Sequence, residues 1–178
     1  MRISVVPTML PAMRRLLVPV LLLLVLAGGF RWWWYQPERV ISRRIVALFD
    51  AAKVEDTASE ISRATRGGAI EGFLAPNVTI LGPEETQEYI EGPQSRDSIV
   101  ANYTVAAKNC RRISFEKPEI DEVTVSGETA QAKARVDAIV EISNNERPAD
   151  GILHLDMQWK EIEGEWVLSS VSWKETGR

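Results

Sequence analysis

The feature that most constrains the fold is a regular alternation of apolar and polar residues in the last third of the chain. Every second residue is apolar over 130–142, and the same period of two returns over 153–159. Successive side chains of a β-strand point to opposite faces, so this pattern predicts two long strands with one buried and one polar face. The segment "EGE" at 163–165 makes a tight turn into "WVLSSVSWK", which completes a hairpin.

Helical spacing dominates the part of the domain that precedes these strands. Pro37 suits the first turn of a helix, and apolar residues then recur at intervals of three and four: Ile41, Ile45, Leu48, Phe49 and Ala52. "TASE" at 57–60 has the spacing of a capping box and predicts a second helix start. Gly67 and Gly68 are expected to weaken or end that helix, which leaves two short pieces. A third helix is predicted over 96–108.

Strand signals connect these helices. "APNVTIL" at 75–81 predicts a short strand, and "RRISFEKPEIDEVTV" at 111–125 leads through the turn "SGET" into the long alternating segment. Helices first and a long antiparallel sheet afterwards predict an α+β domain with its helices on one face of the sheet.

The amino-terminal segment has the composition of a membrane anchor. Residues 16–30 carry no charge but are too short to cross a bilayer as a helix. Extension to Tyr35 gives twenty residues, or about 30 Å at 1.5 Å per residue, which matches the hydrocarbon thickness. Aromatic rings with one polar group concentrate at the membrane interface, and arginine can snorkel to the headgroups. The predicted interface residues are Arg31, Trp32, Trp33, Trp34 and Tyr35.

The sequence therefore predicts a tail over 1–15, a single signal-anchor helix over 16–35 and a domain over 37–178. A cleaved signal peptide that ends after Gly29 is the alternative, but it would leave the exposed aromatic tail "FRWWWYQP". Arginines lie on both sides of the span, so the positive-inside count does not decide the orientation. The usual signal-anchor arrangement places the tail inside and the domain on the outer side of the membrane.

Charge and composition argue against several functions. The net charge of -4 comes from interspersed acids and bases, without the basic block that binds phosphates, so nucleic acid is not an expected partner. With one histidine, the single cysteine Cys110 and no carboxylates at ligand spacing, the sequence predicts neither a metal site nor a cofactor. Cys110 is expected to be a half-buried structural residue, because no positioned base is visible beside it.

Three segments within residues 37–178 carry a family resemblance: "FLAPNVTILGP" from Phe73, "GPQSRDSIVANY" from Gly92 and the final hairpin "LDMQWKEIEGEWVLSSVSW". Together with the order of elements, they resemble the NTF2-like superfamily. This cone-shaped α+β roll is shared by nuclear transport factor 2, ketosteroid isomerases and SnoaL-like cyclases. The whole layout also resembles bacterial membrane proteins in which a short anchor and aromatic residues precede this domain.

The resemblance implies where the catalytic groups of a ketosteroid isomerase would lie in this sequence. Ketosteroid isomerases combine an aspartate base with an oxyanion hole formed by a tyrosine and a protonated aspartate. Arg44 stands at the position of that tyrosine and Gly82 at the position of the base, so the resemblance implies that both groups are missing. The second aspartate could correspond to Asp156, but the alternation points this residue away from the apolar face, as it does the only histidine, His154.

The expected function is therefore binding without catalysis. A small apolar ligand or a protein partner is the expected target, and the resemblance adds a homodimer formed through the sheet face. The predicted pocket or core residues are Phe49, Phe73, Tyr103, Met157, Trp159 and Trp173.

Two alternatives remain open at this point. One is a SnoaL-type isomerase or cyclase that uses Tyr103, His154 or Asp156 for proton transfer. The other is an envelope assembly subunit that resembles the NTF2-like inner-membrane component of type IV secretion. Two or more inward polar groups would favour the enzyme, whereas a filled interior and a broad apolar outer patch would favour assembly.

Overall fold

A computed structural model describes residues 36–82, 92–143 and 148–177. Residues from Pro37 onward form one compact unit. The predicted tail and signal anchor lie outside the described residues. Within the described residues, no helix is both long enough and apolar enough to cross a membrane.

Four helices are described, and the longest two begin where the sequence predicts. They are α2 (Pro37–Ala51), α3 (Glu60–Ala64), α4 (Arg66–Glu71) and α6 (Arg96–Asn109). In α2 the apolar stripe places Ile41 and Ile45 in the core, with no exposed surface on either residue. The Ser95 hydroxyl accepts a hydrogen bond from the backbone N–H of Ser98, and this cap fixes the start of α6.

Two details of the region between α2 and the first strand were predicted wrongly. The N-cap of α3 is Ser59 and not Thr57, because the Ser59 hydroxyl accepts the backbone N–H of Ser62 at 3.2 Å. The break between the two short helices falls at Thr65, and Gly67 lies inside α4. A Cβ atom on Gly67 would collide with the Val100 carbonyl of α6. This glycine therefore permits close helix packing and does not end a helix.

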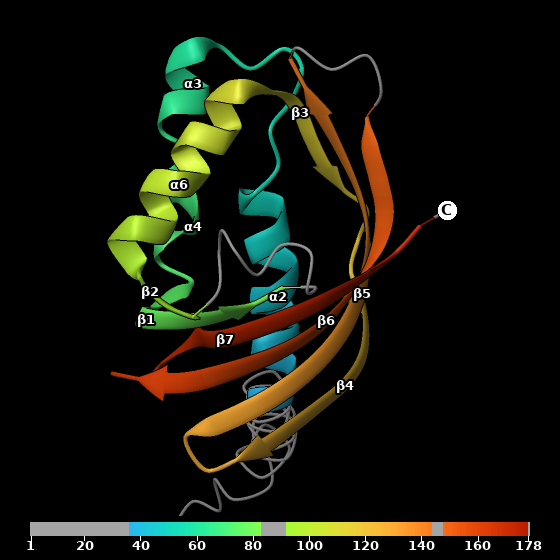
Figure 1. Ribbon diagram of the computed structural model, residues 1–178. Helices are drawn as coiled ribbons and strands as arrows, with labels where there is room; N and C mark the ends of the chain where they lie inside the picture. The colour runs from blue at the N-terminus through green and yellow to red at the C-terminus, as the bar shows by residue number, and fades with distance from the viewer. Residues whose placement is uncertain (1–35, 83–91, 144–147, 178) are drawn as a thin grey trace, which may run out of the picture. The chain divides into compact units, whose positions relative to one another are not determined.

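The strands form one mixed, curved sheet (Figure 1). They are β1 (Leu74–Leu81), β2 (Gly92–Ser95), β3 (Cys110–Phe115), β4 (Glu119–Ser126), β5 (Thr129–Ile142), β6 (Ala149–Ile162) and β7 (Glu165–Thr176). Their order is β2-β1-β7-β6-β5-β3, and β4 also pairs with β5. The pairing of β1 with β7 is parallel, and the others are antiparallel. The short strand β2 was not predicted from the sequence.

The long strand β5 organises the sheet. One edge pairs with β6 from Thr129 to Val140. The other edge is divided, because β4 occupies the half from Thr129 to Arg135 and β3 the half from Ala138 to Ile142. As Figure 1 shows, the sheet bends between these halves, and the helices lie on its concave side. We call this side the inner face and the opposite side the outer face.

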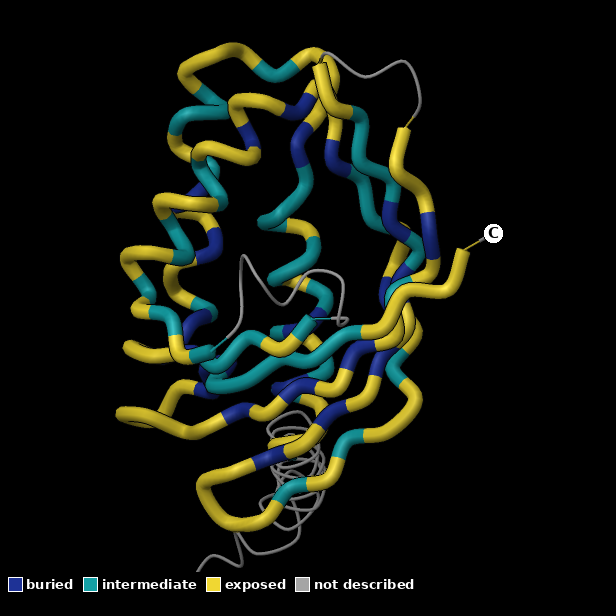
Figure 2. The backbone as a smooth tube through the Cα atoms, viewed as in Figure 1, coloured by how far each residue is buried: buried dark blue, intermediate teal, exposed yellow. Residues whose placement is uncertain are grey.

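The core lies between the helices and the inner face, as the alternation predicts. Buried and exposed segments alternate along the strands in Figure 2. Four buried residues of β5 pack in one cluster with the two core isoleucines of α2, namely Ala130, Ala132, Ala134 and Val136. A register shift between β6 and β7 leaves Ser169 unpaired, so Leu168 and Val171 both face inward.

Candidate functional site

The structure does not bring the three proton-transfer candidates together. Tyr103 projects from α6 and packs against the core on the inner face. His154 and Asp156 are exposed on β6, and they alternate with the buried Leu155 and Met157. The inner and outer faces are separated by the sheet itself. A shared site for the phenol and the other two groups is therefore ruled out by the fold.

Tyr103 is held as a structural residue. Its hydroxyl donates a hydrogen bond to the carbonyl oxygen of Ala52, just after the end of α2. Burial raises the pKa of Tyr103 to about 12. The pKa of this phenol is high and its proton is already donated to a backbone carbonyl oxygen, so the hydroxyl is poorly suited to proton transfer near neutral pH.

The groups on the outer face are also engaged in sheet contacts or face solvent. The Nε2 atom of His154 lies 2.8 Å from the Oγ1 atom of Thr176 on β7. Asp156 stands in register between Lys133 of β5 and Ser172 of β7. Both residues therefore belong to the polar side of the sheet, at the positions that the alternation predicts.

Arg44 has a clear structural role at the position where the isomerases carry a tyrosine. Its Nη2 atom donates to the Gly72 carbonyl oxygen at 2.7 Å, and it lies 3.5 Å from a carboxylate oxygen of Glu165. The guanidinium also lies 5.3 Å from the centroid of the Phe73 ring. Arg44 thus joins α2 to the start of β1 and to β7, and Phe73 is part of this contact. Gly82, which directly follows β1, has no side chain that could act as a base.

The predicted pocket residues divide into core and boundary positions. Trp159 has no exposed surface and Met157 is 2% exposed, so both belong to the core. Trp173 is partly buried on the inner face, opposite Leu155. Phe49 and Tyr103 are partly buried as well, and Phe49 meets Phe115 edge to face, with 5.1 Å between the ring centroids.

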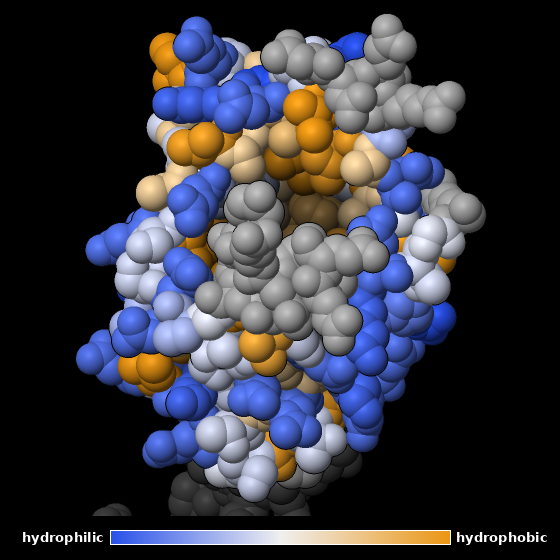
Figure 3. Space-filling view, viewed as in Figure 1, coloured by the Kyte–Doolittle hydropathy of each residue, from blue (hydrophilic) through white to orange (hydrophobic). Residues whose placement is uncertain are grey.

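We call Phe49, Tyr103 and Phe115 the aromatic rim. Tyr103 and Phe115 pack against the main core and also against a second buried cluster formed by Val54, Ala107, Cys110 and Ile113. In Figure 3 the surface between α6 and β3 is hollowed, and the side chains visible inside the hollow are hydrophobic. The three elements that carry the rim are α2, α6 and β3. Sequence reasoning missed Phe115, because β3 is short and its alternation is weak.

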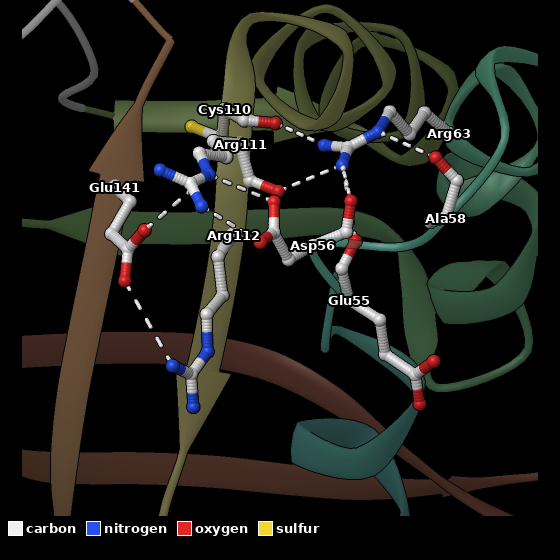
Figure 4. A network of polar contacts seen from close by, with 8 residues as sticks. All are labelled: Glu55, Asp56, Ala58, Arg63, Cys110, Arg111, Arg112 and Glu141. Carbon is white, nitrogen blue, oxygen red and sulfur yellow. Dashed lines mark hydrogen bonds and ion pairs between the residues drawn. The ribbon is translucent and has the colours of Figure 1, made fainter.

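A polar network links α3, the segment before it and the strands β3 and β5 (Figure 4). Arg63 of α3 donates hydrogen bonds to five backbone carbonyl oxygens, from the segment between α2 and α3 and from the start of β3. These belong to Glu55, Asp56, Ala58, Cys110 and Arg111. One side chain therefore joins α3, the preceding loop and β3.

Asp56 and Cys110 in this network have shifted pKa values. Arg111 contacts Asp56 through two hydrogen bonds of 2.8 and 2.9 Å. These bonds lower the pKa of the Asp56 carboxyl. Burial raises the pKa of the Cys110 thiol, and a raised pKa disfavours the reactive thiolate. This agrees with a structural role for Cys110.

No group of three histidine, cysteine or acidic residues in the described parts of the chain could hold a metal ion. Fully buried polar residues are also absent from the described core. The Nε1 atom of Trp159 is buried without a hydrogen-bond partner among the described residues. The inner face thus offers packing surface and very few functional groups.

Comparison with known structures identifies the fold. A conserved protein from Planctomyces limnophilus aligns with a TM-score of 0.59 at 14% identity, over 79% of this chain and 98% of that one. A ketosteroid isomerase-like protein from Erwinia carotovora atroseptica gives a TM-score of 0.59 at 13% identity, over 81% and 99%. An NTF2-like protein from Cytophaga hutchinsonii gives a TM-score of 0.54 at 14% identity, over 77% and 96%.

The fold is NTF2-like. No family model matches the sequence, and no curated protein matches it either. At such low identity the similarity extends to the fold alone, so the function has to be argued from the residues of this chain.

Proposed function

We propose that this protein is a membrane-tethered NTF2-like domain that binds a small apolar ligand and has no catalysis of its own. The observation that carries the proposal is the hydrophobic hollow between α6 and β3 (Figure 3), the two elements that carry Tyr103 and Phe115 of the aromatic rim. Ligand sites are typically concave and lined mainly by apolar and aromatic side chains. Partly exposed aromatic rings over an otherwise closed core fit this description.

The absence of catalysis is supported by the groups that the inner face lacks. Proton abstraction beside a carbonyl needs a positioned base and donors aimed at the developing oxyanion. Arg44 and Gly82 replace the isomerase tyrosine and base, and the Tyr103 hydroxyl is already bonded to a backbone carbonyl.

The tether follows from the sequence of residues 16–35. An uncharged run that ends in an aromatic belt predicts that the full chain fractionates with membranes and resists extraction by carbonate or high salt. Recovery of a chain that begins at Phe30 in the soluble fraction would contradict the anchor and favour the cleaved signal peptide.

Ligand binding can be tested with a neutral apolar fluorescent probe such as Nile red. We expect saturable binding by the full chain in detergent, and a loss of about tenfold in affinity for Phe115→Ala, which corresponds to about 1.4 kcal/mol. Val105→Ala is the matched control, because Val105 lies on α6 and is 58% exposed. A thermal melt of each variant separates weaker binding from unfolding. Equal probe binding by the Phe115 variant and the parent would contradict the proposed site.

The enzymatic alternative draws on structural similarity, at low identity, to a ketosteroid isomerase-like protein and to proteins described as putative dehydratases. We expect no turnover of a β,γ-unsaturated ketosteroid by the purified chain. Turnover by the parent that is lost in Asp156→Asn would contradict the proposal that the protein is not catalytic. The assembly alternative would be favoured by a broad apolar outer patch. The middle of the outer face of β5 and β6 is instead polar, and the exposed Ile152 and Ile162 lie towards opposite ends of β6.

A further inference from the structure

The outer face carries a second hollow, which lies on the other side of the sheet from the aromatic rim. Its volume is about 280 Å³, and it crosses the middle of the sheet. Its side walls come from β1, β4, β5, β6 and β7. We call it the outer groove. It is smaller than most drug-sized pockets, which start at about 300 Å³, so it suits a compact ligand.

Strand register builds the groove from two neighbouring rows of side chains. The first row runs across five strands through Leu81, Ser172, Asp156, Lys133 and Glu122. Neighbouring strands lie about 4.8 Å apart, so such a row extends over roughly 19 Å. It contains an apolar end, a hydroxyl and three charges of alternating sign.

The second row carries no charge and only hydrogen-bonding groups. It runs through Thr79, Ser170, Gln158, Gln131 and Thr124. Each primary amide supplies two donors and an acceptor, and each hydroxyl can both donate and accept. All of this row except Thr79 lines the groove. The two rows together present a dense set of donors and acceptors to one small space.

Two of the three charges in the first row form an ion pair with each other, and the third does not. Lys133 lies 3.4 Å from a carboxylate oxygen of Glu122, so its charge is partly neutralised within the groove. In the described part of the chain, Asp156 forms no ion pair, although Lys133 is its neighbour in register. Two carboxylates against one ammonium leave the groove with a net negative charge. An incoming cation therefore has an unoccupied carboxylate to approach.

We propose that the outer groove binds a small amine-bearing polyol, the chemical class of the amino sugars. The ligand ammonium would contact Asp156 through charge-assisted hydrogen bonds, which are stronger than those between neutral groups. Its hydroxyls would meet the amides of Gln131 and Gln158 and the hydroxyl of Ser170. Leu81 is 44% exposed and offers an apolar contact for ring C–H groups at one end. An anion is disfavoured by the net charge, and an apolar ligand would leave the polar lining without partners.

Two sugars that differ only in one substituent test the proposal. The full chain in detergent is titrated calorimetrically with glucosamine and with glucose at about pH 6, where the amine is protonated. We expect saturable binding of glucosamine and affinity for glucose about tenfold weaker, since a tenfold change corresponds to about 1.4 kcal/mol. High salt should reduce the difference, because Asp156 is exposed.

Matched variants test whether the preference for glucosamine comes from Asp156 in the outer groove. Asp156→Asn keeps the shape of the side chain and removes its charge, so it should abolish the preference for glucosamine. Asp150→Asn is the control, because Asp150 is an exposed carboxylate on the same strand outside the groove. Phe115→Ala should leave glucosamine binding intact, which separates this site from the proposed apolar site. Equal affinities for the two sugars, absence of saturable binding, or an unchanged preference in Asp156→Asn would each overturn the proposal.

Discussion

The two faces of the same sheet differ in what their side chains do. On β5, Ala132 and Ala134 face inward and are 2% exposed, whereas Lys133 and Arg135 face outward and form ion pairs at the surface. Buried apolar side chains contribute most of the stability of a domain, while exposed ion pairs contribute little. The side chains of the inner face therefore contribute most of the stability. Those of the outer face contribute little to it, so they can determine which ligand binds without unfolding the domain.

The largest effect is expected at Trp159. Its side chain is fully buried on the inner face, so Trp159→Ala should lower the free energy of unfolding by about 3 to 5 kcal/mol. Lys160→Ala, at the next and exposed position of β6, should change it by less than about 0.5 kcal/mol. Denaturant unfolding of both variants measures the difference. Similar losses at the two positions would break the distinction between the faces.

A second test applies the same contrast to the two glycines of α4. Gly67 faces α6, and a Cβ atom there would strike the Val100 carbonyl, whereas a Cβ atom on Gly68 would meet no atom within 4 Å. Gly67→Ala should therefore destabilise the protein by about 1 to 3 kcal/mol. Gly68→Ala should stabilise it by about 0.5 to 1 kcal/mol, because alanine favours a helix. Thermal melts that rank the two variants in the opposite order would contradict the packing of α4 on α6.

The third prediction concerns alkaline pH and the inner face. The pKa of Tyr103 is raised to about 12 because burial disfavours the phenolate. The stability that comes from neutral Tyr103 is therefore fully present below its ordinary pKa, about 10, and is lost as the pH rises towards 12. Absorbance titration should show a phenolate step near pH 12 that is missing in Tyr103→Phe. The chain also contains Tyr35 and Tyr89, so the comparison with Tyr103→Phe decides: a step at the ordinary pKa that disappears in this variant would mean that the Tyr103 ring is exposed.

The smallest effect is expected for the surface pair of Asp56 and Arg111. The hydrogen bonds from Arg111 lower the pKa of Asp56. The contribution of ionised Asp56 is therefore present above its ordinary pKa, about 3.9, and is lost as the pH falls through the lower folded value. Arg111→Gln should lower the melting temperature slightly at neutral pH and leave it unchanged in strong acid. High salt should also reduce the difference, and a large loss would mean that this pair acts as a buried one.

Local patterns in the sequence determined most of the elements and, on β5 and β6, the side of the sheet on which a residue lies. The period of two assigned Asp156 and His154 to the polar face, and the stripe of α2 assigned Ile41 and Ile45 to the core, because side-chain direction follows backbone geometry. The helix over 96–108 was found for the same reason, because the apolar spacing of Ile99, Tyr103 and Ala107 lies within one segment.

Tertiary structure decided which residues meet. Whether Gly67 ends a helix or admits a neighbour depends on α6, about thirty residues further along the chain. The row that contains Asp156, Lys133 and Glu122 exists only because three strands pair in one register. Phe115 becomes part of an aromatic rim only when β3 approaches α2 and α6. Alternation sets the face that a side chain occupies, but register and packing between distant segments set its neighbours, and a binding site is made of neighbours.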